Sequence, residues 1–256
     1  MRPERRLLFF VAAAAGFAAF LVWGLTGLPA FGHYRGPYGY LIDRLTVHYT
    51  HATGLVSAVN FFFRGFDTVG EEFILFVAAT GLATVMRGLR EEENEVSGGE
   101  AVSAGVSVPR TSDGVRTLAL LLTGPTLLIG WWLTTHAQTD PSGGFQGGAV
   151  MATAVVLIYL AGEYLKLRRA DPIVVTDSVE AVGAAGFAIV GLFGLVAGGT
   201  YLAEVLPLGK HIGAVNAGGT IPLISLCVGV EVMAAFLLVV SEFLGQTLVL
   251  KGALDS

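Results

Sequence analysis

Two long apolar runs without a charged residue follow one another with only a short polar bridge between them. The runs cover residues 117–135 and 145–162, and the bridge reads HAQTDPSGGFQGG over residues 136–148. A helix needs about 20 apolar residues to cross a bilayer, so the runs predict two membrane spans joined by a tight hairpin. Four glycines within residues 143–148 allow two backbones to approach closely. Pro141 suits a turn just before the second span begins.

The composition of the whole chain is that of an integral membrane protein. Of the 256 residues, 54% are hydrophobic and 14% are charged, and the mean hydropathy is +0.69. A soluble domain carries about 25% charged residues. The formal net charge of −5 and the lack of a basic cluster argue against a nucleic-acid partner. The sequence therefore predicts a multi-pass protein of the cell membrane, embedded in the lipid bilayer.

The hydropathy pattern predicts an all-α protein with about six transmembrane helices. The expected spans are residues 7–28, 70–86, 117–135, 145–162, 181–203 and 220–243. The second is long enough only if it begins at Gly70, which places Glu71 and Glu72 at or just inside one membrane face. With the N-terminus inside, most of the 15 Lys and Arg residues fall in cytoplasmic segments. The positive-inside rule then predicts that both termini are cytoplasmic.

Two segments outside these spans have a distinct composition. Residues 52–63 are apolar but too short to cross, which favours an interfacial or re-entrant helix that ends at Arg64. Residues 90–114 hold several glutamates followed by small Ser, Gly and Ala residues, a composition typical of a flexible linker. The chain is thus predicted to consist of a two-span segment (1–89), a cytoplasmic linker (90–114) and a four-span domain (115–256).

The glycine bridge resembles the PGGGFQGG signature of the B subunit, MnhB, of Mrp-type multisubunit Na⁺/H⁺ antiporters. Related subunits of membrane-bound hydrogenase complexes share this signature. Ser142 stands where the family usually has its first glycine. The matching residues, which we read as a structural hairpin motif, are Pro141, Gly143, Gly144, Phe145, Gln146, Gly147 and Gly148.

A second signature lies upstream, at residues 63–71. Its sequence, FRGFDTVGE, resembles the FRGFDTLGE segment at the C-terminal end of the family's large A subunit, which also occurs as a small separate subunit in the hydrogenases. Two signatures of one complex, in order on one chain, are more specific than either alone. They indicate a fusion of two ancestral pieces.

The resemblance implies a membrane subunit of a multisubunit Na⁺/H⁺ antiporter that contributes to an ion pathway or a scaffold. It implies the other subunits of that complex, Na⁺ and H⁺ as partners, with no cofactor, no metal centre and no enzymatic activity. Two alternatives stay open. One is the homologous subunit of a hydrogenase-type, ion-pumping redox complex, and the other is a purely structural assembly subunit.

Glu231 is the sharpest candidate for an ion-pathway residue, because it lies near the middle of the last span. An ionised carboxylate at the bilayer centre costs about 2.5–3.5 kcal/mol on insertion scales. It must face protein, water or a partner charge, or it must stay protonated. A protonated glutamate bonded to a neighbouring helix is the structural alternative.

Glu71, Glu72 and Asp67 are further ion-pathway candidates. The structural alternative for the glutamates is charge compensation at the N-terminus of the second span. For Asp67 it is a simple ion pair with Arg64.

His136 and Asp140, at the outer end of the third span, complete the candidates. His136 could relay protons or end a helix, and Asp140 suits a turn. Glu180 follows Asp177 by three residues, the spacing of a capping box at the start of the fifth span.

Overall fold

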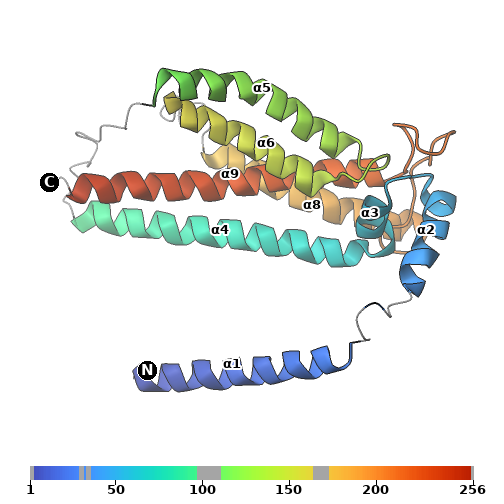
Figure 1. Ribbon diagram of the computed structural model, residues 1–256, viewed down its shortest axis with the longest axis horizontal. Coiled ribbons are helices and arrows are strands. Elements are labelled where there is room, and N and C mark those ends of the chain that lie inside the picture. Colours follow the sequence, from blue (N-terminus) through green and yellow to red (C-terminus); the bar gives the residue numbers. More distant parts are fainter. Residues whose placement is uncertain (1–2, 29–31, 33–35, 97–110, 164–172, 255–256) are drawn as a thin grey trace. The chain divides into compact units, whose positions relative to one another are not determined.

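The regular structure of the chain is helical. The computed structural model describes residues 3–28, 32, 36–96, 111–163 and 173–254. Within these ranges the elements, drawn in Figure 1, are α1 (Pro3–Thr26), α2 (Pro37–Thr50), α3 (Leu55–Ala58), the π-helix η1 (Val59–Phe63), α4 (Gly65–Val96), α5 (Asp113–Thr135), α6 (Gly144–Ile158), the π-helix η2 (Tyr159–Glu163), α8 (Ile173–Gly198) and α9 (Ile221–Leu254).

Six of the described helices are long and apolar enough to cross a membrane. Their spanning segments are Leu7–Thr26, Gly65–Gly88, Asp113–Thr135, Gly144–Gly162, Val175–Gly198 and Ile221–Leu244. The predicted all-α fold with six spans is therefore confirmed.

Residues Met1–Leu41 and Ile42–Ser256 form two separate compact units. In the first, α1 is apolar on all sides, and none of its spanning segment is buried. A helix without a polar face is typical of a segment surrounded by lipid or by other membrane helices.

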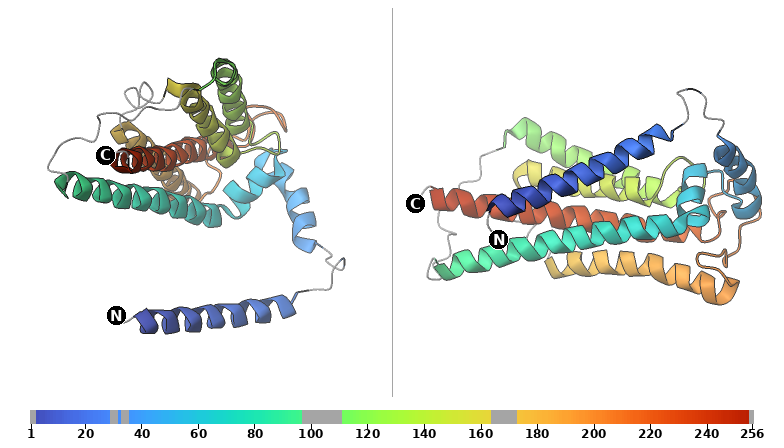
Figure 2. Two further views of the ribbon diagram at one scale, coloured as in Figure 1. Left: turned by 60° about the vertical axis from the view of Figure 1, so that its left-hand side comes forward. Right: turned by 90° about the horizontal axis from the view of Figure 1, so that it is seen from below.

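In the second unit, α9 is the central helix. Figure 2 shows α4, α6 and α8 around it, and each packs along α9, while α5 packs mainly on α6. Half of the spanning segment of α9 is buried, more than in any other described span. Its buried apolar side chains include Ile221, Ile224, Val228, Val232 and Leu238.

Glycines bring α5, α6 and α9 into backbone contact. A Cβ atom added to Gly147 of α6 would meet the Gly130 carbonyl oxygen of α5 at 2.6 Å, besides the Thr134 hydroxyl. A Cβ atom on Gly144 would meet the Ser225 carbonyl oxygen of α9 and would lie 2.8 Å from the Gly229 nitrogen. The close approach predicted from the glycine bridge is confirmed, and it involves a third helix as well.

Interlocked loops close one end of the bundle, and Gln138 holds them together. Its buried side-chain amide donates to the carbonyl oxygen of Val215 at 2.7 Å. Its backbone carbonyl accepts from the N–H groups of Thr53 and Gly54, at 2.9 Å each. Three loops that are distant in sequence are thereby fixed to one another.

The start of α9 is held at the same end of the bundle by Glu204. This carboxylate accepts hydrogen bonds from the backbone N–H and the hydroxyl of Thr220, at 2.7 and 2.9 Å. Burial raises the pKa of the Glu204 carboxyl, and the two hydrogen bonds act in the opposite direction.

Several element boundaries differ from the predicted ones. The helix α2 was not expected, and the short helix predicted over residues 52–63 begins at Leu55 but does end at Arg64. The helix α4 continues to Val96, through the first residues of the predicted linker, because Arg and Glu favour helix there. Residues 97–110 of that linker lie outside the described residues.

Candidate functional site

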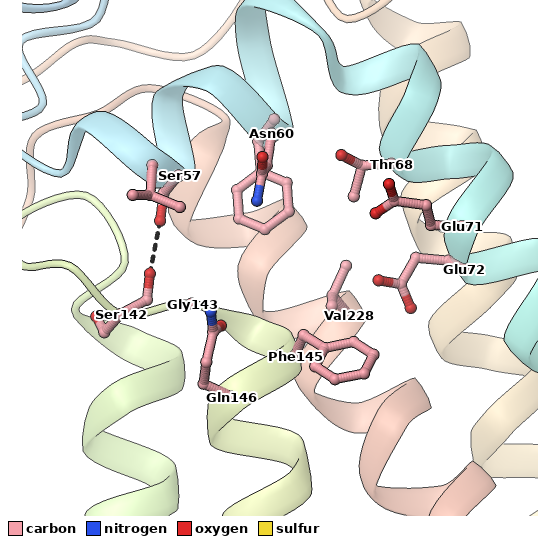
Figure 3. A pocket seen from close by; sticks show the side chains of 12 residues that line it. Ser57, Asn60, Thr68, Glu71, Glu72, Ser142, Gly143, Phe145, Gln146 and Val228 are labelled. Atoms are coloured by element: carbon pink, nitrogen blue, oxygen red, sulfur yellow. Dashed lines mark hydrogen bonds between the residues drawn. The ribbon is translucent and has the colours of Figure 1, made fainter. Parts of the chain in front are cut away.

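A cavity of about 250 Å³ lies at the loop-covered end of the bundle, between η1, α4, α6 and α9. Figure 3 shows its wall, in which the two family-like signatures meet. Thr68 and Glu71 come from the upstream signature, and Ser142, Gly143 and Gln146 come from the glycine bridge. These segments are far apart in the sequence, so the cavity exists only because the chain folds them together.

The wall of the cavity is fixed by a hydrogen bond between α3 and the glycine bridge. The Ser57 hydroxyl donates to the Ser142 carbonyl oxygen at 2.7 Å. The π-helix η1 follows α3 directly and ends at Arg64, whose Nε donates to Asp67 Oδ2 at 2.7 Å. The predicted Arg64–Asp67 pair is thus confirmed. Asp67 lies in the first turn of α4 and is not part of the cavity wall.

Two carboxyl groups of α4 face the cavity, and they differ in exposure. Glu71 is exposed, whereas Glu72 is 4% exposed. Because α4 begins at Gly65, Glu72 lies beyond the first turn. The alternative interpretation of the sequence, in which Glu72 compensates the positive charge at the N-terminus of this helix, is therefore wrong. Its Oε2 atom has no hydrogen-bond partner within the described chain.

Glu231 lies behind Glu72 and is completely buried, with 0% of its surface exposed. Neither of its carboxyl oxygens has a hydrogen-bond partner within the described residues. Its charge interacts with those of Glu72 on α4 and Glu180 on α8. Gly183 of α8 packs directly on it, since an added Cβ atom there would meet the Glu231 Cβ at 2.7 Å.

The structure corrects the assignment of Glu180 as a helix cap. The helix α8 begins at Ile173, so Glu180 lies well inside it, and its side chain is only 1% exposed. The capping-box spacing was misleading because the apolar residues before Asp177 extend the helix backwards by a full turn. The sequence holds a usable signal nonetheless, since a span that starts at Val175 places Glu180 inside the membrane.

A second group of charges links the same three helices farther from the cavity. The two terminal nitrogens of Arg87 on α4 donate to the two carboxylate oxygens of Asp177 on α8, at 3.0 Å each. Arg87 Nε donates to Glu242 Oε1 on α9 at 2.8 Å. Glu242 is 1% exposed. These three residues are too far apart in the sequence, by 90 and 155 residues from Arg87, for their pairing to be predicted from it.

The comparisons with known proteins identify the domain that contributes the glycine bridge. A family model described as a domain related to the MnhB subunit of Na⁺/H⁺ antiporter matches residues 114–238. The chain carries an MnhB-like domain. The resemblance read from the bridge is therefore confirmed. The MnhB-like domain supplies Glu180 and Glu231, whereas Glu71, Glu72 and Arg87 precede it. The resemblance of residues 63–71 to the A subunit stays a prediction.

Similar proteins extend beyond the MnhB-like domain. An uncharacterized protein of Methanocaldococcus jannaschii is 28% identical over 237 residues, which cover 84% of this chain and 86% of that protein. A chain in the structure of the membrane-bound sulfane sulfur reductase, an archaeal respiratory membrane complex, is 29% identical. That match has a TM-score of 0.68 and covers 94% of this chain and 98% of the other.

A chain in the structure of the Mrp complex from Dietzia sp. DQ12-45-1b has the same fold. The TM-score is 0.66 at 19% sequence identity, and the match covers 94% of this chain but 26% of that longer chain. In these matches the helices that precede the MnhB-like domain are aligned together with it. The helices that line the cavity therefore belong to a fold that recurs in these structures.

His136 and Asp140 of the MnhB-like domain lie outside the cavity wall. The His136 ring stacks on Trp132 with centroids 4.9 Å apart, and its Nδ1 lies 3.0 Å from the Trp132 carbonyl oxygen. His136 is the C-cap residue of α5. Asp140 is a turn residue whose carboxylate accepts a hydrogen bond from the Thr139 hydroxyl at 3.0 Å. These contacts fit the structural roles expected from the sequence, in which His136 ends a helix and Asp140 lies in a turn.

Proposed function

We propose that this chain is a membrane subunit of a multisubunit Na⁺/H⁺ antiporter and forms part of its ion pathway. The other subunits of the complex, Na⁺ and H⁺ would be its partners, and the chain would need no cofactor and catalyse no reaction. The observation that carries the proposal is the cavity that opens onto Glu71 and Glu72, with the buried Glu231 behind them. The MnhB-like domain supports the assignment to an antiporter.

The burial of the carboxyl groups favours a pathway over a pure scaffold. A carboxylate placed in the middle of a membrane helix costs about 2.5–3.5 kcal/mol. Glu231 recovers little of that cost, because its oxygens accept no hydrogen bond within the described chain. Well-packed apolar side chains would hold α4, α8 and α9 together at least as well. A role in ion transfer explains why these positions carry acids.

The alternative assignment, to an ion-pumping redox complex, rests on the 29% identity to a chain of the sulfane sulfur reductase complex. The cavity and its acids would serve an ion pathway in either complex. Mass spectrometry of the subunits that co-purify with this chain separates the two assignments. Iron–sulfur or nickel–iron subunits would identify a redox complex, and their absence from an intact, exchange-active complex would identify an antiporter.

Replacing Glu231 with glutamine should slow Na⁺/H⁺ exchange. Glutamine keeps the size and most of the hydrogen-bonding capacity of a protonated glutamate, but it cannot ionise. We expect a decrease of roughly tenfold or more, in line with the loss of a positioned proton-transfer group. The measurement is exchange in everted membrane vesicles from neutral to alkaline pH, with the abundance of the complex followed by immunoblot.

The matched control for Glu231→Gln is Asp113→Asn, which neutralises an exposed carboxylate in the first turn of α5. The control should exchange ions like the native complex. If Glu231→Gln leaves both the rate and the pH optimum unchanged at normal abundance, this chain is a scaffold.

The proposed orientation places the cavity end of the bundle outside the cell and both termini in the cytoplasm. The exposed residue Pro141 then lies outside and Asp113 lies inside. In a Cys227→Ser background, Pro141→Cys should react with a membrane-impermeant maleimide added to intact cells, whereas Asp113→Cys should react only after permeabilisation. The opposite labelling pattern would reverse the orientation.

A further inference from the structure

The acidic groups do not end at Glu231 but continue along the bundle as a connected series. The charge of Glu72 interacts with that of Glu71 at the cavity. Gly183 follows Glu180 by three residues on α8 and packs directly on the Glu231 side chain, which brings this face of α8 against Glu231. Glu72 and Glu180 lie close enough to Glu231 for their charges to act on it. Asp177 precedes Glu180 by three residues on the same face of α8. Asp177 is bound by Arg87. Each acid in this series therefore lies near the next one, from the cavity to the ion-paired group of Arg87, Asp177 and Glu242.

We propose that Glu180 transfers protons between Glu231 and the surface beside Asp177, so that Glu72, Glu231 and Glu180 form a single proton path from the cavity to the Arg87 end of the bundle. This inference rests on the proposed function and names the ion that this chain conducts. It also assigns a transport role to Glu180, a residue that the two signatures do not include.

The surroundings of Glu180 suit a group that gains and loses a proton. It is 1% exposed, and its Oε1 atom has no hydrogen-bond partner within the described chain. The ionisable groups coupled to it are Asp177 on its own helix and Glu231 on α9. Neither neighbour is a cation that would hold Glu180 permanently ionised. Because Arg87 holds Asp177 in its charged form, the charge state of Glu180 depends on whether Glu231 carries a proton.

Each transfer breaks an O–H bond on one carboxyl group and forms one on the next carboxylate, so no oxidant or reductant is needed. Glu231 has no direct hydrogen bond to Glu72 or Glu180. A bridging water must therefore relay the proton on each side of Glu231. Because three neighbouring buried acids cannot all be ionised at low cost, a proton that enters at Glu72 favours the release of another at Glu180.

Arg87 acts in this scheme as a positioning residue for the far end of the path. Its two terminal nitrogens hold both oxygens of Asp177, whose side chain is 38% exposed. Such a two-point contact fixes the plane of the carboxylate. Asp177 is thereby held between the buried Glu180, three residues along the same helix, and the surface.

The test compares Glu180→Gln with Glu180→Asp in the assembled complex, reconstituted into liposomes. Glu180→Gln should reduce Na⁺/H⁺ exchange by roughly tenfold or more. Glu180→Asp, which keeps an ionisable group one methylene shorter, should recover much of the rate with a shifted pH profile. Asp113→Asn serves as the control. Infrared difference spectra recorded across a pH step should also show a carboxylic-acid C=O band in the native complex that is lost in Glu180→Gln. A carboxyl group with a purely structural role does not change its protonation in the pH step, so its replacement would leave the difference spectrum unchanged.

The outcomes separate this inference from the proposed function. If Glu231→Gln stops exchange but Glu180→Gln exchanges at the native rate with its carboxyl band intact, the path does not pass through Glu180 and the inference is wrong. If both variants exchange normally, the proposed function itself fails. If Glu180→Gln lowers exchange only as far as it lowers the abundance of the complex, the carboxyl group maintains packing and the inference is wrong.

Discussion

Replacing either Gly144 or Gly147 with valine should prevent the complex from assembling. A Cβ atom at Gly144 collides with the Ser225 carbonyl oxygen of α9, and one at Gly147 collides with the Thr134 hydroxyl and lies 2.6 Å from the Gly130 carbonyl oxygen of α5. Most of these obstacles are backbone atoms, which cannot move aside by changing a rotamer. Overpacking typically costs about 1–3 kcal/mol. A collision with backbone atoms lies at the upper end of that range, so we expect the helices to separate.

The measurement for the glycine variants is the amount of assembled complex in detergent-solubilised membranes, resolved by native electrophoresis. The control is Gly81→Val in α4, where an added Cβ atom meets nothing within 4 Å. We expect the complex to be nearly absent with either bridge variant and near normal with the control. Normal assembly with Gly144→Val would mean that α6 and α9 do not touch in the complex as they do here.

The position of the spans could be predicted from the sequence because it depends on hydropathy and length alone. The same holds for the glycine bridge, whose residue types can serve only a close contact or a turn, and for the Arg64–Asp67 pair, which is local. The ends of α8 could not be predicted as well. Its first residues are apolar on either reading, and a local capping pattern pointed to a later start.

The arrangement of the acids could not be read from the sequence because it depends on how the helices are rotated about their axes. Glu72, Glu180 and Glu231 lie on three helices, and only packing around α9 brings them together. Glu242 lies near the end of the last span, a position from which a carboxylate can reach the membrane interface. It is buried instead, because Arg87 reaches it from α4.

The meeting of the two signatures at one cavity gives a physical reason for their presence on one chain. Glu71 lies on the upstream signature, and the wall that faces it is built by Ser142 and Gln146 of the bridge. Ser57 fixes that wall through its hydrogen bond to the Ser142 carbonyl oxygen. A bridge without its glycines could not lie so close to α9, and the cavity would lose one side.

Replacing Arg87 with glutamine should destabilise the bundle strongly, although the residue lies far from the cavity. Arg87 is the ionic partner of Glu242, which is 1% exposed. Removing one member of a buried ion pair costs about 3–5 kcal/mol. Because the side chain of Arg87 is 35% exposed, solvent screens part of this loss, and we expect roughly 2–4 kcal/mol. The measurement is the thermal unfolding midpoint of the purified complex, with Arg44→Gln, an exposed arginine of α2, as the control.

A second substitution shows whether the loss comes from the ion pair. With Glu242→Gln added, the buried charge is gone, so the double variant should lose less stability than the sum of the two single variants. Additive losses would mean that Arg87 stabilises the bundle through its packing or through Asp177 alone. Arg87→Lys completes the test, since lysine keeps the charge but cannot bind both oxygens of Asp177 as guanidinium does. If Arg87→Lys restores the unfolding midpoint yet exchanges ions more slowly than the native complex, the stabilising charge and the positioning of Asp177 are separate contributions of the same side chain.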